Sequence, residues 1–108
     1  MTTYEKSKVI ALEESIDYAD GGVISKQVTK NSAGNITLFS FDKGQGLTEH
    51  AANYDAFVQI LDGEAEIQLE GVPHLLKKGD CIIMPANVPH ALKAVEQFKM
   101  LLTMIRGE

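Results

Sequence analysis

The sequence has no tryptophan, and only one cysteine and three prolines, among its 108 residues. With Cys81 alone, no disulfide can form within the chain, which favours a reducing compartment. No apolar run approaches the roughly 18 residues that a membrane-spanning helix needs. The first residues also lack the basic-then-apolar order of a secretory signal. These absences predict a cytoplasmic protein with no membrane partner.

Basic residues are also scarce, since 10 Lys and Arg stand against 15 Asp and Glu, for a formal net charge of −5 at pH 7. A polyanion is repelled on average by this charge, and the sequence has no Lys/Arg stripe with interleaved aromatic residues. Aromatic residues make up 6% of the chain, which leaves few surfaces on which bases could stack. Nucleic acid is therefore excluded as an expected partner.

What the sequence does contain is a series of short β-type runs separated by Gly, Asn, Asp and Pro, which favour turns. The runs cover residues 23–30, 36–41, 56–61, 64–70, 73–77, 81–84, 91–95 and 98–105. Asp62-Gly63 separates two of them and predicts a tight type I′ hairpin. The run that follows alternates apolar and polar residues, as a half-buried strand does. The pattern predicts an all-β fold, with antiparallel strands arranged as a jelly roll.

The length of the chain is that of one domain. We expect the barrel to occupy residues 21–108. Residues 1–20 are less strand-like and form an N-terminal segment, either an edge strand or an extension. Within it, residues 12–16 fit either a helical turn or an edge segment, and one short helical turn is the most helix that we expect in the fold.

Two segments resemble the signature motifs of the cupin family. Residues 44–63 resemble the first motif, in which a glycine, a His-x-His pair, a glutamate and a closing glycine follow at fixed spacing. Residues 79–90 resemble the second motif, with Asn87 at the place of its inner glycine. Both fit without gaps. The resemblance implies the cupin barrel, a jelly roll also described as a double-stranded β-helix.

In metal-binding cupins, two histidines and a glutamate of the first motif and one histidine of the second hold a divalent ion. The resemblance gives His50 and His90 as candidate metal ligands, whereas Ala52 and Ala56 stand where the second histidine and the glutamate belong. Asp55 is adjacent to the glutamate position, but on a regular strand its side chain points to the opposite face. The resemblance thus implies, at most, a weakly bound Zn, Fe, Ni, Mn or Cu ion.

Two alanines in place of two ligands would leave a larger and less polar cavity. We expect it to bind a small molecule and to be lined by His50, His90, Ala52, Ala56, Val58 and Met84. Such cavities bind organic ligands that a few polar groups orient, which favours a small-molecule-binding cupin with a sensing or accessory role. The first alternative is a metal-dependent oxygenase or isomerase with a His-only site. The second is a non-catalytic dimeric scaffold.

Other residues have simpler interpretations. We expect His74 to have a core or rim role and Cys81 to be a small buried hydrophobic residue. Met84, Met100 and Met104 are predicted to fill the barrel rather than bind copper. We also expect a homodimer, because a small barrel with exposed β edges is stabilised when a second copy covers them.

Overall fold

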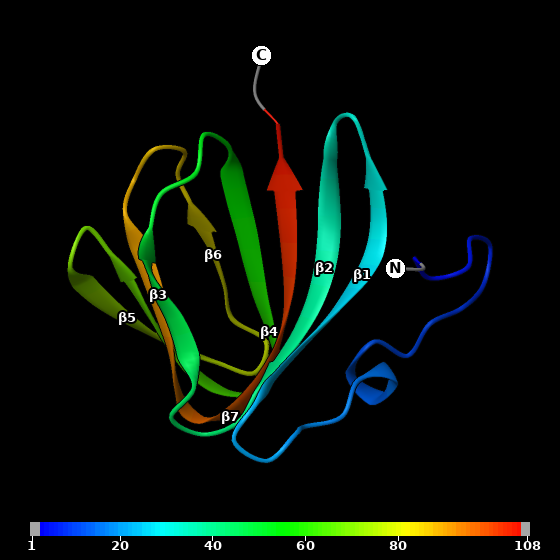
Figure 1. Cartoon of the computed structure of the whole chain (residues 1–108), viewed down its shortest axis with the longest axis horizontal. Helices are drawn as coiled ribbons and strands as arrows, with labels where there is room; N and C mark the ends of the chain where they lie inside the picture. The colour runs from blue at the N-terminus through cyan, green and yellow to red at the C-terminus, as the bar shows by residue number, and fades with distance from the viewer. Residues whose placement is uncertain (1–2, 107–108) are drawn as a thin grey trace.

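A computed structural model describes residues 3–106 as a β-barrel with one short 3-10 turn (Figure 1), which confirms the predicted all-β jelly roll. The turn is η1 (Glu13–Ser15). The strands are β1 (Val23–Asn31), β2 (Gly34–Phe41), β3 (Gly46–His50), β4 (Asp55–Leu69), β5 (Val72–Lys77), β6 (Cys81–Met84) and β7 (His90–Ile105). Within residues 3–106, no helix is long and apolar enough to cross a membrane.

The long strands β4 and β7 belong to both halves of the barrel. The first part of β4 pairs with the last part of β7, from Asp55↔Ile105 to Gly63↔Phe98, in a sheet with the order β1-β2-β7-β4-β6. The last part of β4 pairs with the first part of β7, from Ala65↔Ala94 to Leu69↔His90, in a sheet with the order β3-β7-β4-β5. Figure 1 shows both strands bending at the bottom of the barrel, so that the two sheets face each other above the bend.

The hairpin predicted at Asp62-Gly63 is wrong, because β4 continues through these residues with register shifts on either side. Gly63 has φ 79°, and a Cβ there would lie 1.8 Å from the carbonyl oxygen of Gln97. Only glycine permits the two backbones to approach this closely. The Asp-Gly pair correctly indicates a residue with positive φ. That conformation occurs in a bulge of a bent strand as well as in a tight turn.

The barrel interior is apolar, and its largest rings lie near the bend. Phe41 and Phe98 are fully buried, and their rings stack with centroids 4.6 Å apart. The predicted packing role of the methionines agrees with the structure, since Met84 and Met100 are buried and Met104 packs against the core. The prediction that Cys81 is buried is wrong. In β6 the inward positions belong to its neighbour Ile82 and to Met84, so Cys81 faces outward.

The N-terminal segment crosses the outer face of the β1-β2-β7-β4-β6 sheet. Ser40 of β2 donates a hydrogen bond to the carbonyl oxygen of Asp17 at 2.7 Å. Ile16 and Leu38 are 1% and 0% exposed, yet neither belongs to the core inside the barrel. Leu38 and Ser40 share one face of β2. A second, smaller apolar layer therefore lies between this segment and the outside of the sheet.

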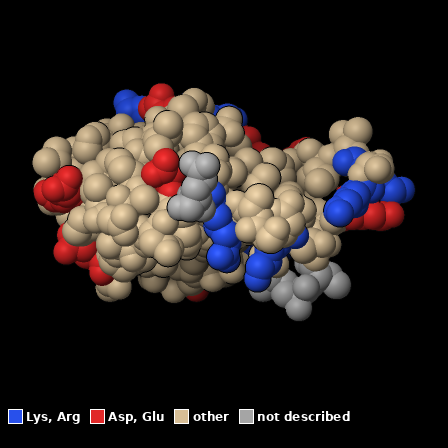
Figure 2. Space-filling view, turned by 90° about the horizontal axis from the view of Figure 1, so that it is seen from above, with Lys and Arg blue, Asp and Glu red and all other residues tan. Residues whose placement is uncertain are grey.

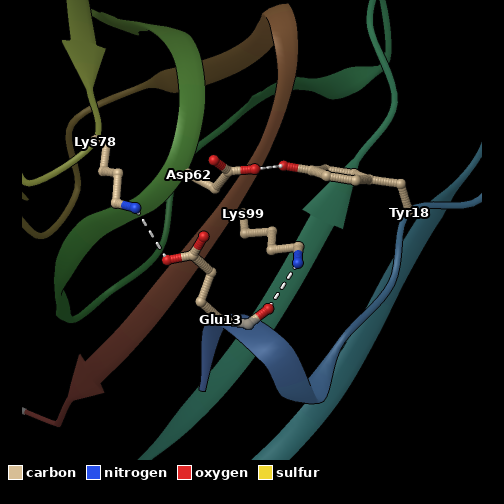
Figure 3. Close-up of polar contacts among 5 residues, drawn as sticks. All are labelled: Glu13, Tyr18, Asp62, Lys78 and Lys99. Atoms are coloured by element: carbon tan, nitrogen blue, oxygen red, sulfur yellow. Dashed lines mark hydrogen bonds and ion pairs between the residues drawn. The ribbon is translucent and has the colours of Figure 1, made fainter. Parts of the chain in front are cut away.

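Polar contacts of Glu13 and Tyr18 also hold the N-terminal segment against the barrel (Figure 3). Tyr18 donates a hydrogen bond to the Asp62 carboxylate at 2.5 Å, and the Lys99 ammonium donates one to the carbonyl oxygen of Glu13 at 2.6 Å. The Glu13 carboxylate also lies 3.3 Å from the Lys78 ammonium. Burial, and then the hydrogen bond and negative charge of Asp62, raise the pKa of Tyr18 well above its ordinary value. The tyrosine is therefore a neutral donor at every physiological pH.

Candidate functional site

The two candidate histidines lie side by side at the open end of the barrel. His50 is the last residue of β3, His90 is the first residue of β7, and the two are register partners. Their ring centroids are 4.3 Å apart, with an angle of 64° between the ring planes. His90 is 7% exposed, whereas His50 is exposed. The strand pairing thus brings together the two residues that the motifs singled out.

Both imidazoles are oriented in the same way by their own backbone. Nδ1 of His50 lies 2.9 Å from the carbonyl oxygen of Thr48, and Nδ1 of His90 lies 3.2 Å from that of Val88. A carbonyl oxygen only accepts hydrogen bonds, so each Nδ1 must carry the proton. In the neutral ring, Nε2 is then the atom with a free lone pair. Each histidine can therefore accept a hydrogen bond or coordinate an ion through Nε2.

The surroundings favour the neutral ring of His90. Burial lowers the pKa of His90 below 6.5, and the neighbouring His50 lowers it further, while the hydrogen bond to Val88 opposes them. Burial is the largest of these effects because it penalises the charged form. The lone pair on Nε2 of His90 is consequently available at neutral pH.

A small apolar cavity lies beside the two rings. It is lined by Leu47, His50, Ala52, Tyr54, Ala56, Met84, His90, Leu92, Met100, Leu102 and Met104. The space open to the centres of water molecules is about 50 Å³, and one water needs roughly 10–15 Å³ on that measure. The cavity therefore has room for a few waters, one hydrated ion or a short end of a ligand.

Five of the six residues predicted to bind a ligand line this cavity, and Val58 does not. Val58 is fully buried within the core. Sequence reasoning missed Tyr54, which lies in the loop between β3 and β4, where neither motif nor alternation gives a signal. It also did not assign Met100 and Met104 to the site. Their alternation along β7 places them inside the barrel, but only the fold shows that they reach this cavity.

Two loops frame the open end. The backbone N–H of Asn87 donates a hydrogen bond to the carbonyl oxygen of Ala52 at 2.6 Å, which ties the loop after β6 to the loop after β3. Asn87 has φ 65°, a conformation that asparagine tolerates better than other non-glycine residues. Its place at the inner glycine position of the second motif is thereby explained. Figure 2 views the molecule from this end, and uncharged side chains cover most of the barrel's face.

The residues present do not fit the four-ligand metal site of metal-binding cupins. Ala52 and Ala56 both line the cavity and offer no donor. Asp55 faces away from it, as predicted, and its carboxylate accepts a hydrogen bond from the backbone N–H of Ala86 at 2.8 Å. Among residues 3–106, no group of three His, Cys, Asp and Glu side chains is placed to hold a metal ion. The nitrogen donors of the site are two imidazoles.

Comparison with known proteins agrees with this architecture. The family Cupin_2, described as a cupin domain, matches residues 37–106. A conserved protein of unknown function from Streptococcus pyogenes is 37% identical, with a TM-score of 0.91 over 100% of this chain and 97% of the other. A Cupin 2 conserved barrel domain protein from Leptotrichia buccalis is 39% identical, with a TM-score of 0.87 over 90% of this chain and 47% of the other.

Among curated relatives, an uncharacterized protein of Aquifex aeolicus is 27% identical over 106 residues, which are 96% of this chain and 88% of that protein. The two solved structures share the barrel, and none of the three names states a chemistry. By the extent of the family match and by its fold, the chain belongs to the cupin family.

Proposed function

We propose that this cupin barrel binds a small molecule, with a sensing or accessory role. One observation carries the proposal: His50 and His90 are held by backbone carbonyl groups so that both Nε2 atoms remain free at a small apolar cavity. A few polar groups in an otherwise apolar pocket are the usual composition of a ligand site. The rings fix the polar end of the ligand, and the alanines and methionines take a short apolar part.

The chemistry of the imidazoles narrows the class of ligand. A neutral ring that donates from Nδ1 accepts at Nε2, so the matching ligand group is a hydroxyl or amine that donates a hydrogen bond. The cavity volume of about 50 Å³ admits only a short group. The remainder of a larger ligand would lie at the mouth, between the loops that Asn87 and Ala52 join.

A thermal-shift screen with metabolites, on chelator-treated protein, tests this proposal. A ligand present at 100 times its dissociation constant adds about 2.7 kcal/mol to the free energy of unfolding. The double variant His50→Ala/His90→Ala should lose the shift. His74→Ala is the matched control, because His74 lies on β5 and does not line the cavity. Loss of the shift only in His74→Ala would contradict the proposed site, and no shift with any compound or ion would favour the scaffold alternative.

A second candidate is a metal-dependent cupin enzyme with a His-only site, of the oxygenase or isomerase type. The favouring observation is that metal-binding histidines typically donate their other ring N–H to a backbone carbonyl or carboxylate, and both rings here do so. Elemental analysis for Zn, Fe, Ni, Mn and Cu before and after dialysis against chelator separates the two candidates. An ion retained at one per chain favours the enzyme, and an ion lost to the chelator favours a weak site.

We also propose a homodimer. Large apolar side chains are exposed on the outside of β5 and β6, with Val72 and Leu75 at 56% and Ile83 at 60% exposure. Covering them would remove apolar surface from water. Light scattering should give twice the chain mass of 11.8 kDa, and a mass of one chain would contradict the dimer.

A cytoplasmic location remains a proposal as well. Its support is that Cys81 is an exposed free thiol, and exposed thiols persist in reducing compartments. Fractionation of the source cells, with detection of the native protein, tests it. Recovery outside the cytoplasm would contradict it.

A further inference from the structure

Two methionines flank the position where metal-binding cupins carry a glutamate. Ala56 of β4 has Met84 of β6 as its register partner on one side and Met104 of β7 on the other. Side chains directly opposite each other on neighbouring antiparallel strands have Cβ atoms about 4.5–5.5 Å apart. The position of Ala56, where metal-binding cupins have a carboxylate, therefore has a thioether side chain on each side.

These sulfur atoms and the imidazoles come from opposite walls of one cavity. Met84 and Met104 belong to the β1-β2-β7-β4-β6 sheet, whereas His50 and His90 pair within the β3-β7-β4-β5 sheet. All four side chains line the cavity of about 50 Å³ at the open end. Facing sheets are packed about 10 Å apart, a gap that long side chains reaching inward from both walls can close.

The charge of the cavity selects among metal ions. None of its lining residues is Asp or Glu, so a divalent ion would carry unneutralised charge into an apolar pocket. The cost of burying an ion by Born solvation rises with the square of its charge. A monovalent ion is consequently favoured. Among ions that imidazole binds, thioether sulfur selects Cu(I), while Zn(II) and Fe(II) prefer nitrogen, carboxylate or thiolate.

We propose that this cavity is a copper(I) site, with Nε2 of His50 and His90 and the thioether sulfurs of Met84 and Met104 as ligands. The sequence alone favours a packing role for the methionines, and the structure gives them a second role because they share a cavity with two free imidazole nitrogens. The proposal rests on the metal-binding candidate function in one respect, namely that both imidazoles line the cavity and engage their backbone carbonyl groups through Nδ1, which leaves Nε2 as the coordinating atom.

The test is an anaerobic titration of the metal-free protein with Cu(I), kept reduced by ascorbate, in competition with a chromophoric Cu(I) chelator. We expect one Cu(I) per chain. X-ray absorption of the loaded protein should show sulfur as well as nitrogen around the copper. Copper that is surrendered fully to the chelator, or that has only nitrogen and oxygen neighbours, would overturn the proposal without any variant.

Met84→Leu and Met104→Leu remove each sulfur while conserving volume, a change that protein cores usually tolerate. Each should lower the Cu(I) affinity by more than the ~10-fold that loss of a supporting residue costs. The affinity for Zn(II), measured with a Zn(II) indicator, should not change, since zinc takes no thioether. Equal losses for both ions would mean a structural effect and contradict the thioether ligands.

His74→Ala again serves as the histidine control and should bind Cu(I) as the wild type does. The thermal-shift screen described above uses copper-free protein. A ligand shift there without Cu(I) binding here would leave small-molecule binding intact and refute only the copper site. Cu(I) binding that survives His50→Ala/His90→Ala would refute the site as assigned.

Discussion

The two ends of the barrel use the same strands for different purposes. At the bend, which we call the filled end, Phe41, Ile60 and Phe98 are at most 1% exposed. At the other, hollow end, β4 begins near Ala56 and β7 begins at His90, beside a cavity. Large side chains therefore hold the sheets together where they cross, whereas at the hollow end two of the residues that line the cavity, Ala52 and Ala56, are small. The core packing and the proposed binding cavity thus lie at different ends of the barrel.

The largest expected effect is at the filled end. Phe98→Ala removes a ring that stacks on Phe41 at 4.6 Å and should lower the free energy of unfolding by about 3–5 kcal/mol. His50→Ala, at an exposed position of the hollow end, should change it by no more than about 0.5 kcal/mol. Urea unfolding curves measure both. A histidine variant as destabilised as Phe98→Ala would break the division between the two ends.

The outer apolar layer should come next in size. Ile16→Ala leaves a void beneath the N-terminal segment, where Ile16 is 1% exposed, and should cost about 2 kcal/mol, at the low end for such changes. The exposed Val9→Ala, in the same segment, is the control and should have almost no effect. If both variants unfold like the wild type, the segment does not contribute to the stability of the barrel.

Filling the cavity at the hollow end should raise the free energy of unfolding, whereas the two preceding changes lower it. Ala56→Val places two methyl groups in the cavity, and cavity-filling substitutions commonly add about 0.5–2 kcal/mol of stability. The same change should weaken binding of any ligand found in the screen, because it occupies the ligand's space. Thermal denaturation and ligand titration of one variant check both halves. A variant that loses stability and keeps its affinity would show that the cavity is not the binding site.

The smallest effect concerns pH. Because the pKa of Tyr18 in the folded chain is raised above the ordinary 10.0, mainly by burial, the unfolded chain loses this proton first as pH rises. The contribution of Tyr18 is therefore complete below pH 10 and is lost as pH rises beyond it. Tyr18→Phe should flatten the fall in stability above pH 10, and an unchanged slope in alkaline unfolding curves would contradict the raised pKa of Tyr18.

The sequence predicts the fold well because its motifs and most of its strands have local signals. Its errors occur where tertiary contacts decide. Asp62-Gly63 indicates a positive φ, but the neighbouring β7 makes it a bulge. Strand β3, Gly46–His50, was missed because four of its five residues are exposed and show no alternation. Cys81 was assigned to the wrong face, since alternation along a four-residue strand does not say which face is buried.

For the site, the motifs identify His50 and His90, but they do not describe what surrounds them. Met104 belongs to neither motif and lies 48 residues after Ala56 in the sequence. Only the pairing of β4 with β7 makes the two residues neighbours. The free Nε2 atoms depend on carbonyl groups of Thr48 and Val88, whose orientation no pattern reports. The donor set and the cavity therefore required the structure.

The orientation of the two imidazoles is the claim on which the site depends. Long-range ¹H–¹⁵N correlation spectra of the metal-free protein at neutral pH distinguish the two neutral tautomers of each histidine. We predict the Nδ1–H tautomer for both His50 and His90, with Nε2 unprotonated, since both Nδ1 atoms face carbonyl oxygens. The Nε2–H tautomer in either ring would contradict the account.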